Sequence, residues 1–208
     1  MDTQVYLVRH GETEWNASGK YQGCTDIALS KEGIIQAEYL KKRFDKSFSC
    51  IYTSPLKRAM ETARIISENT GATPIISKEL REINFGEWEG LTVSEIKNKY
   101  PNEFNNWKTD ETSADLVGGD LSLKNSSIRS TNEILRIVKE NKGKKIIIVA
   151  HGGIIKAGLL GIFQWKLTMY HKFALGNTSV SKLNFDDDLN AYLITLNDTS
   201  HLPSAGTL

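Results

Sequence analysis

Five residues of types that handle phosphate stand at or near the ends of short apolar segments. They are Arg9, His10, Arg58, Glu82 and His151. Arginine offers a planar fork of donors that suits phosphate oxygens, and two arginines from different segments could hold one phosphoryl group from two sides. A neutral histidine ring nitrogen can attack phosphorus, and a nearby carboxylic acid can protonate the departing alkoxide. These residue types together indicate chemistry on a phosphate ester.

Each of these residues also has a plainer interpretation. A histidine at a strand end is more often a hydrogen-bonded structural residue, and Arg58 could be a solvated charge on its helix. Glu82 has three acidic neighbours, so its assignment as the proton donor depends on the sequence motif around it more than on its chemistry. Neither His-x-x-x-His nor a similar ligand spacing occurs, and paired arginines would repel a cation. We therefore expect neither a metal nor a cofactor.

Composition restricts the class of protein. The chain has 208 residues, of which 39% are hydrophobic and 25% charged, values typical of a globular domain with a substantial core. Lys and Arg number 26 against 25 Asp and Glu, which gives a formal net charge of +1. A nucleic-acid surface usually needs a basic excess, so we expect no nucleic-acid partner. An anion must instead be held locally by a few cations.

The sequence gives no sign of a membrane or secretory protein. Two cysteines, Cys24 and Cys50, are too few for a disulfide framework and form no Cys-x-x-Cys pattern. The longest apolar runs, such as residues 154–163 interrupted by Lys156, are shorter than the ~20 residues that a membrane span requires. The N-terminus lacks a basic region followed by a long apolar one. We expect a soluble, cytoplasmic protein without a membrane partner.

Short β-branched runs alternate with segments of helical periodicity along most of the chain. Strands are expected over Gln4–Arg9, Cys50–Thr53, Pro74–Ser77, Lys145–Ala150, Ser179–Phe185 and Ala191–Leu196. Helices are expected after Ser30 (Ile34, Ala37, Leu40, Phe44), after Ser54-Pro55 (Ala59, Met60, Ala63, Ile66), after Thr92, over Ile128–Lys139 and over Ile154–Phe163. Residues 102–125 are weakly patterned, and we expect irregular structure there with one short helix around Phe104 and Trp107.

The alternation predicts an α/β fold, a three-layer α/β/α sandwich with a mostly parallel sheet that ends in a hairpin. Ligands of such sheets bind beyond the carboxyl ends of the strands, which is where His10 and His151 fall. Gly11 and Gly152 follow these histidines and allow close approach of backbone to a ligand. No linker-like stretch divides the chain, so we expect a single domain.

Several sequence blocks resemble, in order, those of the histidine phosphatase superfamily in its phosphoglycerate-mutase-like branch. The blocks are Leu7–Asn16, Tyr52–Ala63, Leu80–Gly90, Val149–Gly153 and Leu196–Leu202. The resemblance implies that His10 attacks phosphorus and becomes a phosphohistidine, while Glu82 protonates the leaving oxygen and later accepts a proton from water. Arg9, Arg58 and His151 would bind the phosphoryl oxygens and complete the catalytic set. The substrate-binding residues implied are Arg9, Asn16, Gln22, Gly23, Arg58, Glu82, His151 and Gly152.

The resemblance also bears on the substrate. The longer insertion and the basic, Tyr-containing segment usual in mutases are not evident, which favours hydrolysis of a small-molecule phosphate ester. Residues 88–90 and 197–199 look most like the α-ribazole-5′-phosphate phosphatases of cobalamin biosynthesis. The alternatives are a broad-specificity or phosphoserine phosphatase, a phosphoglycerate mutase, and a non-catalytic phospho-ligand-binding module.

The resemblance leaves several structural features open. Relatives often carry Gly-Glu-Ser before the helix that precedes the last core strand, whereas this chain has Val117–Ser122. We expect residues 1–208 to form one histidine phosphatase domain in which residues 80–125 cap the active site. Trp15 and Trp88 could belong either to the core or to the pocket wall. Relatives are often dimers, which allows for a homodimer here, although no exposed apolar stripe indicates one.

Overall fold

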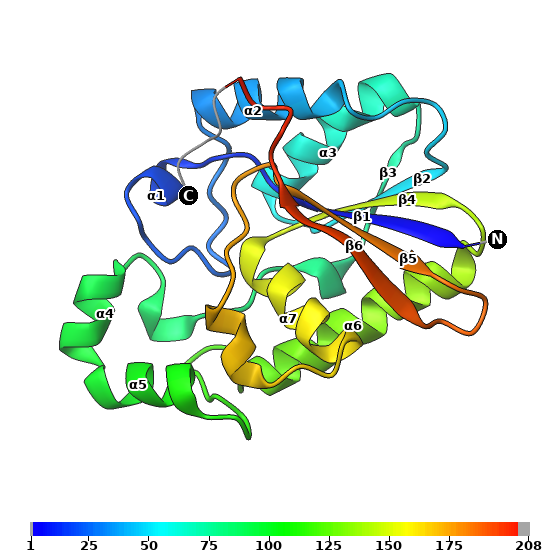
Figure 1. Cartoon of the computed structure of the whole chain (residues 1–208). Helices are drawn as coiled ribbons and strands as arrows, with labels where there is room; N and C mark the ends of the chain where they lie inside the picture. The colour runs from blue at the N-terminus through cyan, green and yellow to red at the C-terminus, as the bar shows by residue number, and fades with distance from the viewer. Residues whose placement is uncertain (1, 204–208) are drawn as a thin grey trace.

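The computed structural model describes residues 2–203, which form a six-stranded mixed sheet in the order β3-β2-β4-β1-β5-β6 (Figure 1). The strands are β1 (Thr3–Arg9), β2 (Cys50–Thr53), β3 (Pro74–Ile76), β4 (Lys145–Ala150), β5 (Val180–Phe185) and β6 (Ala191–Asp198). Strands β1 to β4 pair in parallel, whereas β5 is antiparallel to both β1 and β6. All six expected strands are present, and the closing hairpin is confirmed.

Helices precede and follow the strands as the alternation predicts. The α-helices are α1 (Glu14–Ala17), α2 (Lys31–Lys41), α3 (Lys57–Thr70), α4 (Val93–Lys99), α5 (Pro101–Thr109), α6 (Leu123–Glu140) and α7 (Gly152–Ile162). Short 3₁₀ helices are η1 (Lys78–Leu80), η2 (Gly86–Trp88) and η3 (Leu167–His171). Within residues 2–203, each helix is too short or too polar to cross a bilayer.

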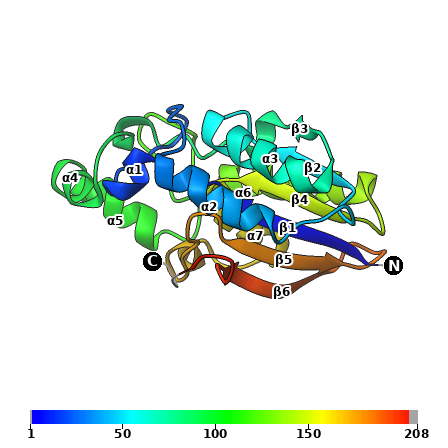
Figure 2. The same ribbon diagram turned by 90° about the horizontal axis from the view of Figure 1, so that it is seen from above.

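The apolar residues of β4 divide between the two faces of the sheet. Ile147 and Val149 pack in the core beneath α2 and α3, whereas Ile146 and Ile148 pack in the core shared with α6 and α7. Side chains alternate along a strand, so a strand with an unbroken apolar run such as Ile146–Ala150 must be covered on both sides. Figures 1 and 2 show the two helical layers, and the three-layer α/β/α sandwich is confirmed.

The pairing of β1 with β4 sets the position of the two His-Gly motifs, His10-Gly11 and His151-Gly152. Arg9 lies opposite Ala150 in the parallel register, and the backbone N–H of His10 donates to the carbonyl of Ala150 over 3.0 Å. His10 and His151 therefore leave the sheet side by side, with ring centroids 5.1 Å apart. Helices α1, α4 and α5 lie beyond the end of the sheet remote from the N-terminus (Figures 1 and 2).

The region between the third and fourth strands contains more helix than the sequence predicts. The short helix around Phe104 and Trp107 is confirmed as α5, which Pro101 opens directly after α4 ends, and it buries both aromatic rings. Helix α6 begins at Leu123, five positions before the predicted Ile128. Its periodicity is weak in the first turns, but the Ser122 hydroxyl accepts from the Asn125 N–H and caps it.

Two apolar residues expected on inner helix faces lie outside. Ile34 of α2 is 43% exposed and Met60 of α3 is 38% exposed. Ala37 and Leu40 fill the buried face of α2, and Ala59, Ala63 and Ile66 that of α3, so these helices approach the sheet mainly through small side chains. Ile34 and Met60 stand at the edges of these stripes, a distinction that helical spacing alone does not make.

Candidate active site

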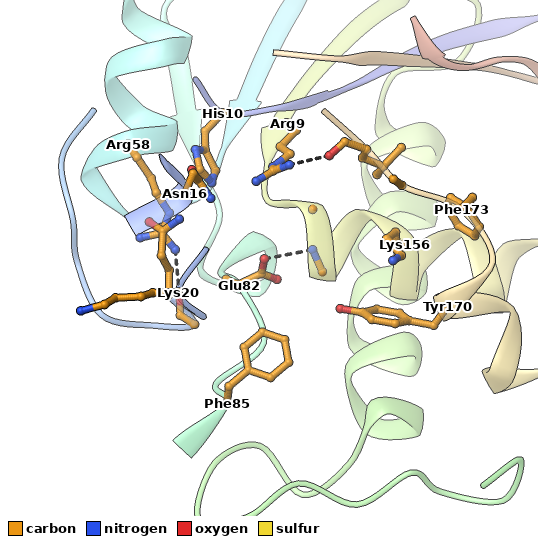
Figure 3. Close-up of a pocket in the computed structure, with 16 residues that line it drawn as sticks. Arg9, His10, Asn16, Lys20, Arg58, Glu82, Phe85, Lys156, Tyr170 and Phe173 are labelled. Carbon is orange, nitrogen blue, oxygen red and sulfur yellow. Dashed lines mark hydrogen bonds between the residues drawn. The ribbon is translucent and has the colours of Figure 1, made fainter. Parts of the chain in front are cut away.

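A pocket of about 280 Å³, called the His10 pocket below, opens beyond the carboxyl ends of β1 and β4 (Figure 3). Its lining residues are Arg9, His10, Asn16, Lys20, Gln22, Gly23, Arg58, Glu82, Phe85, Gly152, Gly153, Lys156, Tyr170, Phe173, Ala174 and Leu175. The structure thus brings together every site residue expected from the sequence except His151, which lies behind the pocket surface.

His10 is held in a defined tautomer. Its Nδ1 lies 2.6 Å from the carbonyl oxygen of Gly11, and because a carbonyl can only accept, Nδ1 carries the proton. Nε2 is then left with its lone pair. The side chain is only 2% exposed, and burial, reinforced by Arg58 and Arg9, holds its pKa well below the usual value. His10 is therefore a neutral imidazole, the state that a nucleophile towards phosphorus requires.

Arg58, in the first turn of α3, is completely buried and fixed by three acceptors. Its guanidinium donates to Nδ1 of His151 over 3.1 Å, to the Thr25 carbonyl over 2.8 Å and to the Gly23 carbonyl over 2.7 Å. A guanidinium has five N–H donors, so two are left for a ligand. Burial lowers the pKa of Arg58, but an arginine remains charged because its ordinary pKa is so high.

Arg9 faces Arg58 across the pocket, and its Nε–H is among the donors that are not used. One of its terminal nitrogens donates to the Leu175 carbonyl, while its buried Nε has no hydrogen-bond partner among the described residues. A Cβ on Gly152 would lie 3.4 Å from this Nε, so a glycine at this position lets the guanidinium pack closely against the start of α7. A buried, unpaired, positively charged donor is costly, and an anion in the pocket would relieve that cost.

Glu82 lies against the first turn of α7. Its carboxylate accepts from the backbone N–H groups of Ile83 (2.9 Å), Gly153 (2.9 Å) and Ile154 (2.7 Å). Burial raises its pKa, although these N–H groups and Arg58 act in the opposite direction. Glu82 is thus rigidly placed and retains a proton at higher pH than an exposed glutamate, which suits a proton donor.

His151 is fully buried beside His10. Its Nδ1 accepts from Arg58, so in the neutral ring Nε2 carries the proton and donates to the Ser54 hydroxyl over 2.7 Å. Burial and the nearby Arg58 hold its pKa well below the usual value. Both ring nitrogens are therefore engaged by the protein. The expected contact between His151 and a phosphoryl oxygen stays a prediction, while its contact with Arg58 is present.

Asn16 lies in α1, and Gln22 and Gly23 lie on the segment that follows this helix. The side-chain oxygen of Asn16 accepts from Thr13 and Asn177, which leaves its NH₂ group as the donor available to a ligand. The side-chain oxygen of Gln22 is buried without a partner among the described residues. Gly23 has a φ of +52°, and a Cβ there would collide with the Glu89 carboxylate, so only glycine fits.

The wall opposite His10 is absent from the sequence-based site. It consists of Lys156 on α7 and of Tyr170, Phe173, Ala174 and Leu175 from η3 and the following loop. Lys156 could have been found from the sequence, because it is the only charged residue in the apolar helical run of residues 154–163. The loop after η3 has no recognisable pattern that would indicate its place in the pocket. Of the two tryptophans left open, Trp88 is completely buried in the core, and neither lines the pocket.

Residues 80–125 contribute Glu82 and Phe85 to the pocket, and the role of this segment as a cap stays a prediction. Among residues 2–203, no three His, Cys, Asp or Glu side chains come together in a group that could hold a metal ion. The other two histidines, His171 and His201, hydrogen-bond to the Trp107 carbonyl and the Thr178 hydroxyl and lie outside the pocket lining.

Comparison with known proteins gives several full-length similarities. The chain is 34% identical to phosphoglycerate mutase-like protein 4 of Arabidopsis thaliana, over 99% of this chain and 89% of the relative. It is 32% identical to phosphoserine phosphatase 1 of Hydrogenobacter thermophilus, over 96% of this chain and 94% of the relative.

Solved structures show the same similarity. A phosphoserine phosphatase mutant from Entamoeba histolytica in complex with phosphoserine superposes with a TM-score of 0.89 at 37% identity, covering 96% of this chain and 99% of that one. A candidate α-ribazole-5′-phosphate phosphatase from Escherichia coli superposes with a TM-score of 0.82 at 25% identity, covering 96% and 98%. The narrower resemblance to the α-ribazole branch is thus the more distant one.

A sequence model described as "Histidine phosphatase superfamily (branch 1)" matches residues 5–199. The match includes every residue of the His10 pocket. The chain therefore belongs to branch 1 of the histidine phosphatase superfamily, and it is a phosphoric monoester hydrolase.

Proposed function

We propose that the protein hydrolyses phosphoserine, or a closely similar small phosphate monoester, through a phosphohistidine formed on His10. The observation that carries this proposal is the environment of His10. Its unprotonated Nε2 belongs to a buried neutral ring in a pocket where Arg9 and Arg58 have unused donors and Glu82 is held by α7. The similarities to phosphoserine phosphatases support the choice of substrate.

In the first half-reaction, Arg9, Arg58 and the NH₂ group of Asn16 bind the phosphoryl oxygens. Nε2 of His10 attacks phosphorus in line, so that a P–N bond forms while the bond to the ester oxygen breaks. Glu82 transfers its proton to that oxygen, and the alcohol leaves. The two buried guanidinium groups stabilise the charge on the transferring group, which is the main requirement of phosphoryl transfer.

In the second half-reaction, the carboxylate of Glu82 accepts a proton from a water molecule that attacks the phosphohistidine. The P–N bond breaks, inorganic phosphate leaves, and His10 returns to its neutral form. The proton taken from water replaces the one that left with the alcohol, so Glu82 is again protonated and the cycle balances. These steps use only the side chains of the pocket and water, which is consistent with a metal-independent enzyme.

The sequence blocks favour α-ribazole 5′-phosphate, but the similarities support phosphoserine more strongly, because the phosphoserine phosphatases are more similar to this chain than the candidate α-ribazole-5′-phosphate phosphatase is. We further propose that residues 1–208 act as one unit in which residues 80–125 cap the pocket. Glu82 and Phe85 support this, since both belong to that segment and line the pocket.

The proposal is tested by mixing the purified protein with phosphoserine labelled on phosphorus and quenching in alkali or acid. A labelled adduct that survives alkali and is lost in acid, and that is absent from His10→Ala, is expected. Rates with phosphoserine, α-ribazole 5′-phosphate, 3-phosphoglycerate and p-nitrophenyl phosphate identify the substrate. Transfer of label between positions of phosphoglycerate without release of phosphate would indicate a mutase instead, and loss of activity in EDTA would overturn the metal-free steps.

A further inference from the structure

Besides Arg9 and Arg58, the His10 pocket has a positively charged group that the proposed reaction does not use. Lys156 lines the pocket from α7, four residues after Gly152. Four residues correspond to about 6 Å along a helix, a little more than one turn. Lys156 therefore stands about one helical turn beyond the position where Glu82 contacts the start of the helix.

Aromatic rings hold the Lys156 ammonium in place. Its Nζ lies 4.1 Å from the ring centroid of Tyr170 and 5.4 Å from that of Phe173, and both rings line the same pocket. A cation over a ring face is attracted by the π electrons, more strongly where water is excluded. Burial also lowers the pKa of Lys156, to about 8, with Glu82 acting in the opposite direction. The ammonium is thus positioned and partly desolvated.

Lys156 has no carboxylate partner in the part of the chain that the structure describes, and no hydrogen bond to it is found there. Some other lysines on the molecule are paired with carboxylates, for example Lys41 with Glu68 over 2.8 Å and Lys166 with Glu111 over 2.9 Å. A partly buried ammonium that faces a pocket without a counter-ion favours a ligand that brings a second anionic group.

We propose that Lys156 binds the carboxylate of the substrate, and that it makes the enzyme select phosphate monoesters with a carboxylate three bonds from the ester oxygen. Phosphoserine and 3-phosphoglycerate share this arrangement. The inference rests on the proposed phosphomonoesterase function and specifies the substrate class of that same site. Figure 3 shows the ammonium between Glu82 and the two rings, whereas the Lys20 side chain, which also borders the pocket, points away from it.

The test compares two pairs of substrates that differ at the carboxylate, which is replaced by hydrogen in one pair and by a hydroxymethyl group in the other. Phosphoserine is paired with phosphoethanolamine, and 3-phosphoglycerate is paired with glycerol 3-phosphate. Wild-type enzyme, Lys156→Gln, Lys156→Arg and the control Lys172→Gln are assayed on all four. Lys172 is a good control because it is exposed, lies next to Phe173 and is absent from the pocket lining, so its substitution removes the same charge without touching the site.

Lys156→Gln is expected to lower kcat/KM for the carboxylated member of each pair roughly 10- to 100-fold, the size of one charge-assisted hydrogen bond. The loss should appear mainly in KM. Activity on the member without a carboxylate should change by less than about threefold, because the phosphate end is untouched. Lys156→Arg should keep the preference, and Lys172→Gln should behave as wild type.

Equal losses on both members of a pair, or no loss on either, would overturn the assignment of Lys156. If phosphoserine is hydrolysed and Lys156→Gln retains the wild-type preference, the inference fails and the proposed function stands. If the enzyme hydrolyses 3-phosphoglycerate but not phosphoserine, and Lys156→Gln abolishes the preference over glycerol 3-phosphate, Lys156 keeps its role and phosphoserine is the wrong substrate. If circular dichroism shows that Lys156→Gln folds poorly, the test uses wild-type enzyme and Lys156→Arg instead. The inference is overturned if neither of these two proteins prefers the carboxylated substrate of each pair.

Discussion

The Nε–H of Arg58 donates to Nδ1 of His151 over 3.1 Å, in a part of the molecule where both side chains are completely buried. This bond connects the first turn of α3 to the residue that follows β4. It also fixes the tautomer of His151, whose Nε2–H donates to Ser54. His151 therefore orients the guanidinium of Arg58 from behind the pocket.

Replacement of His151 should separate this positioning role from direct contact with phosphate. His151→Ala leaves the Arg58 Nε–H buried without an acceptor, and we expect a loss of about 1–3 kcal/mol in unfolding free energy together with a large fall in kcat/KM. His151→Asn places an amide oxygen near the former position of Nδ1, where it can accept from Arg58. Its kcat/KM should therefore be at least tenfold higher than that of His151→Ala. Urea unfolding and steady-state kinetics provide the measurements. Equal damage in both variants would indicate that the ring itself contacts the phosphoryl group.

Glu82→Gln should affect substrates according to their leaving group. The variant keeps the size of the side chain but has no acidic proton, and general acid catalysis contributes about 10²- to 10⁴-fold to a rate. For phosphoserine, whose alkoxide is a poor leaving group, a loss in that range is expected. For p-nitrophenyl phosphate, whose phenolate leaves without a proton, the formation of the phosphoenzyme should be much less affected. Similar losses in single-turnover rates on both substrates would contradict the assignment of Glu82 as the acid.

Two adjacent glycines offer a matched test of how closely the pocket is packed. A Cβ at Gly153 would lie 2.6 Å from Glu82 Oε1 and 2.9 Å from the Tyr170 hydroxyl, whereas one at Gly152 would lie 3.4 Å from the nearest atom of Arg9. Gly153→Ala must displace Glu82 and should lower kcat at least tenfold more than Gly152→Ala. Both residues are in the first turn of α7, so the change in helix propensity is similar. A greater loss in Gly152→Ala would show that Arg9 is the less tolerant group.

Acid should destabilise the protein below pH 6.5. The pKa values of all four histidines are lowered by burial, to about 4 for His171 and His201, and well below the usual value for the buried pair His10 and His151. The unfolded chain binds protons near pH 6.5 while the folded chain does not, so stability decreases as pH falls through that value. Each of His10 and His151 should remove about 1.4 kcal/mol per pH unit between pH 6.5 and its folded pKa.

Urea unfolding between pH 7.5 and 4.5 measures this dependence. The variant His201→Gln serves as a control, because it removes one partly buried histidine outside the pocket and should reduce the slope without changing the active site. A free energy of unfolding that stays constant from pH 6.5 to 5 would show that His10 and His151 titrate normally in the folded protein.

The sequence predicts the phosphate side of the site well, for a physical reason. Arg9 and His10 end a buried strand, and His151 ends another, so once the strands are recognised as parallel neighbours their ends must meet. Arg58 and Glu82 come from segments that the family resemblance identifies. Neither source reveals that Arg58 and Ser54 occupy both nitrogens of His151, since this depends on side-chain orientation within the folded core.

The opposite wall could not be predicted in the same way. Tyr170, Phe173 and Leu175 belong to a 3₁₀ helix and a loop whose sequence has no regular period, and they reach the pocket only because α7 and β5 fix the ends of that segment. The start of α6 was also missed, because it depends on the Ser122 cap and on Leu123, not on a long amphipathic pattern. A local hydrogen bond thus decides where α6 begins, whereas the ends of two neighbouring elements decide where the wall lies.

The two walls of the pocket have separate origins in the fold, and this has a consequence for how such an enzyme changes during evolution. Arg9 and His10 are attached to the end of the sheet, and Glu82 to the start of α7, whereas Lys156, Tyr170 and Phe173 stand on one helix turn and one short segment. New side chains at these three positions would leave the sheet and the nucleophile where they are. Substrate preference can therefore diverge through few mutations, while the chemical steps are inherited unchanged.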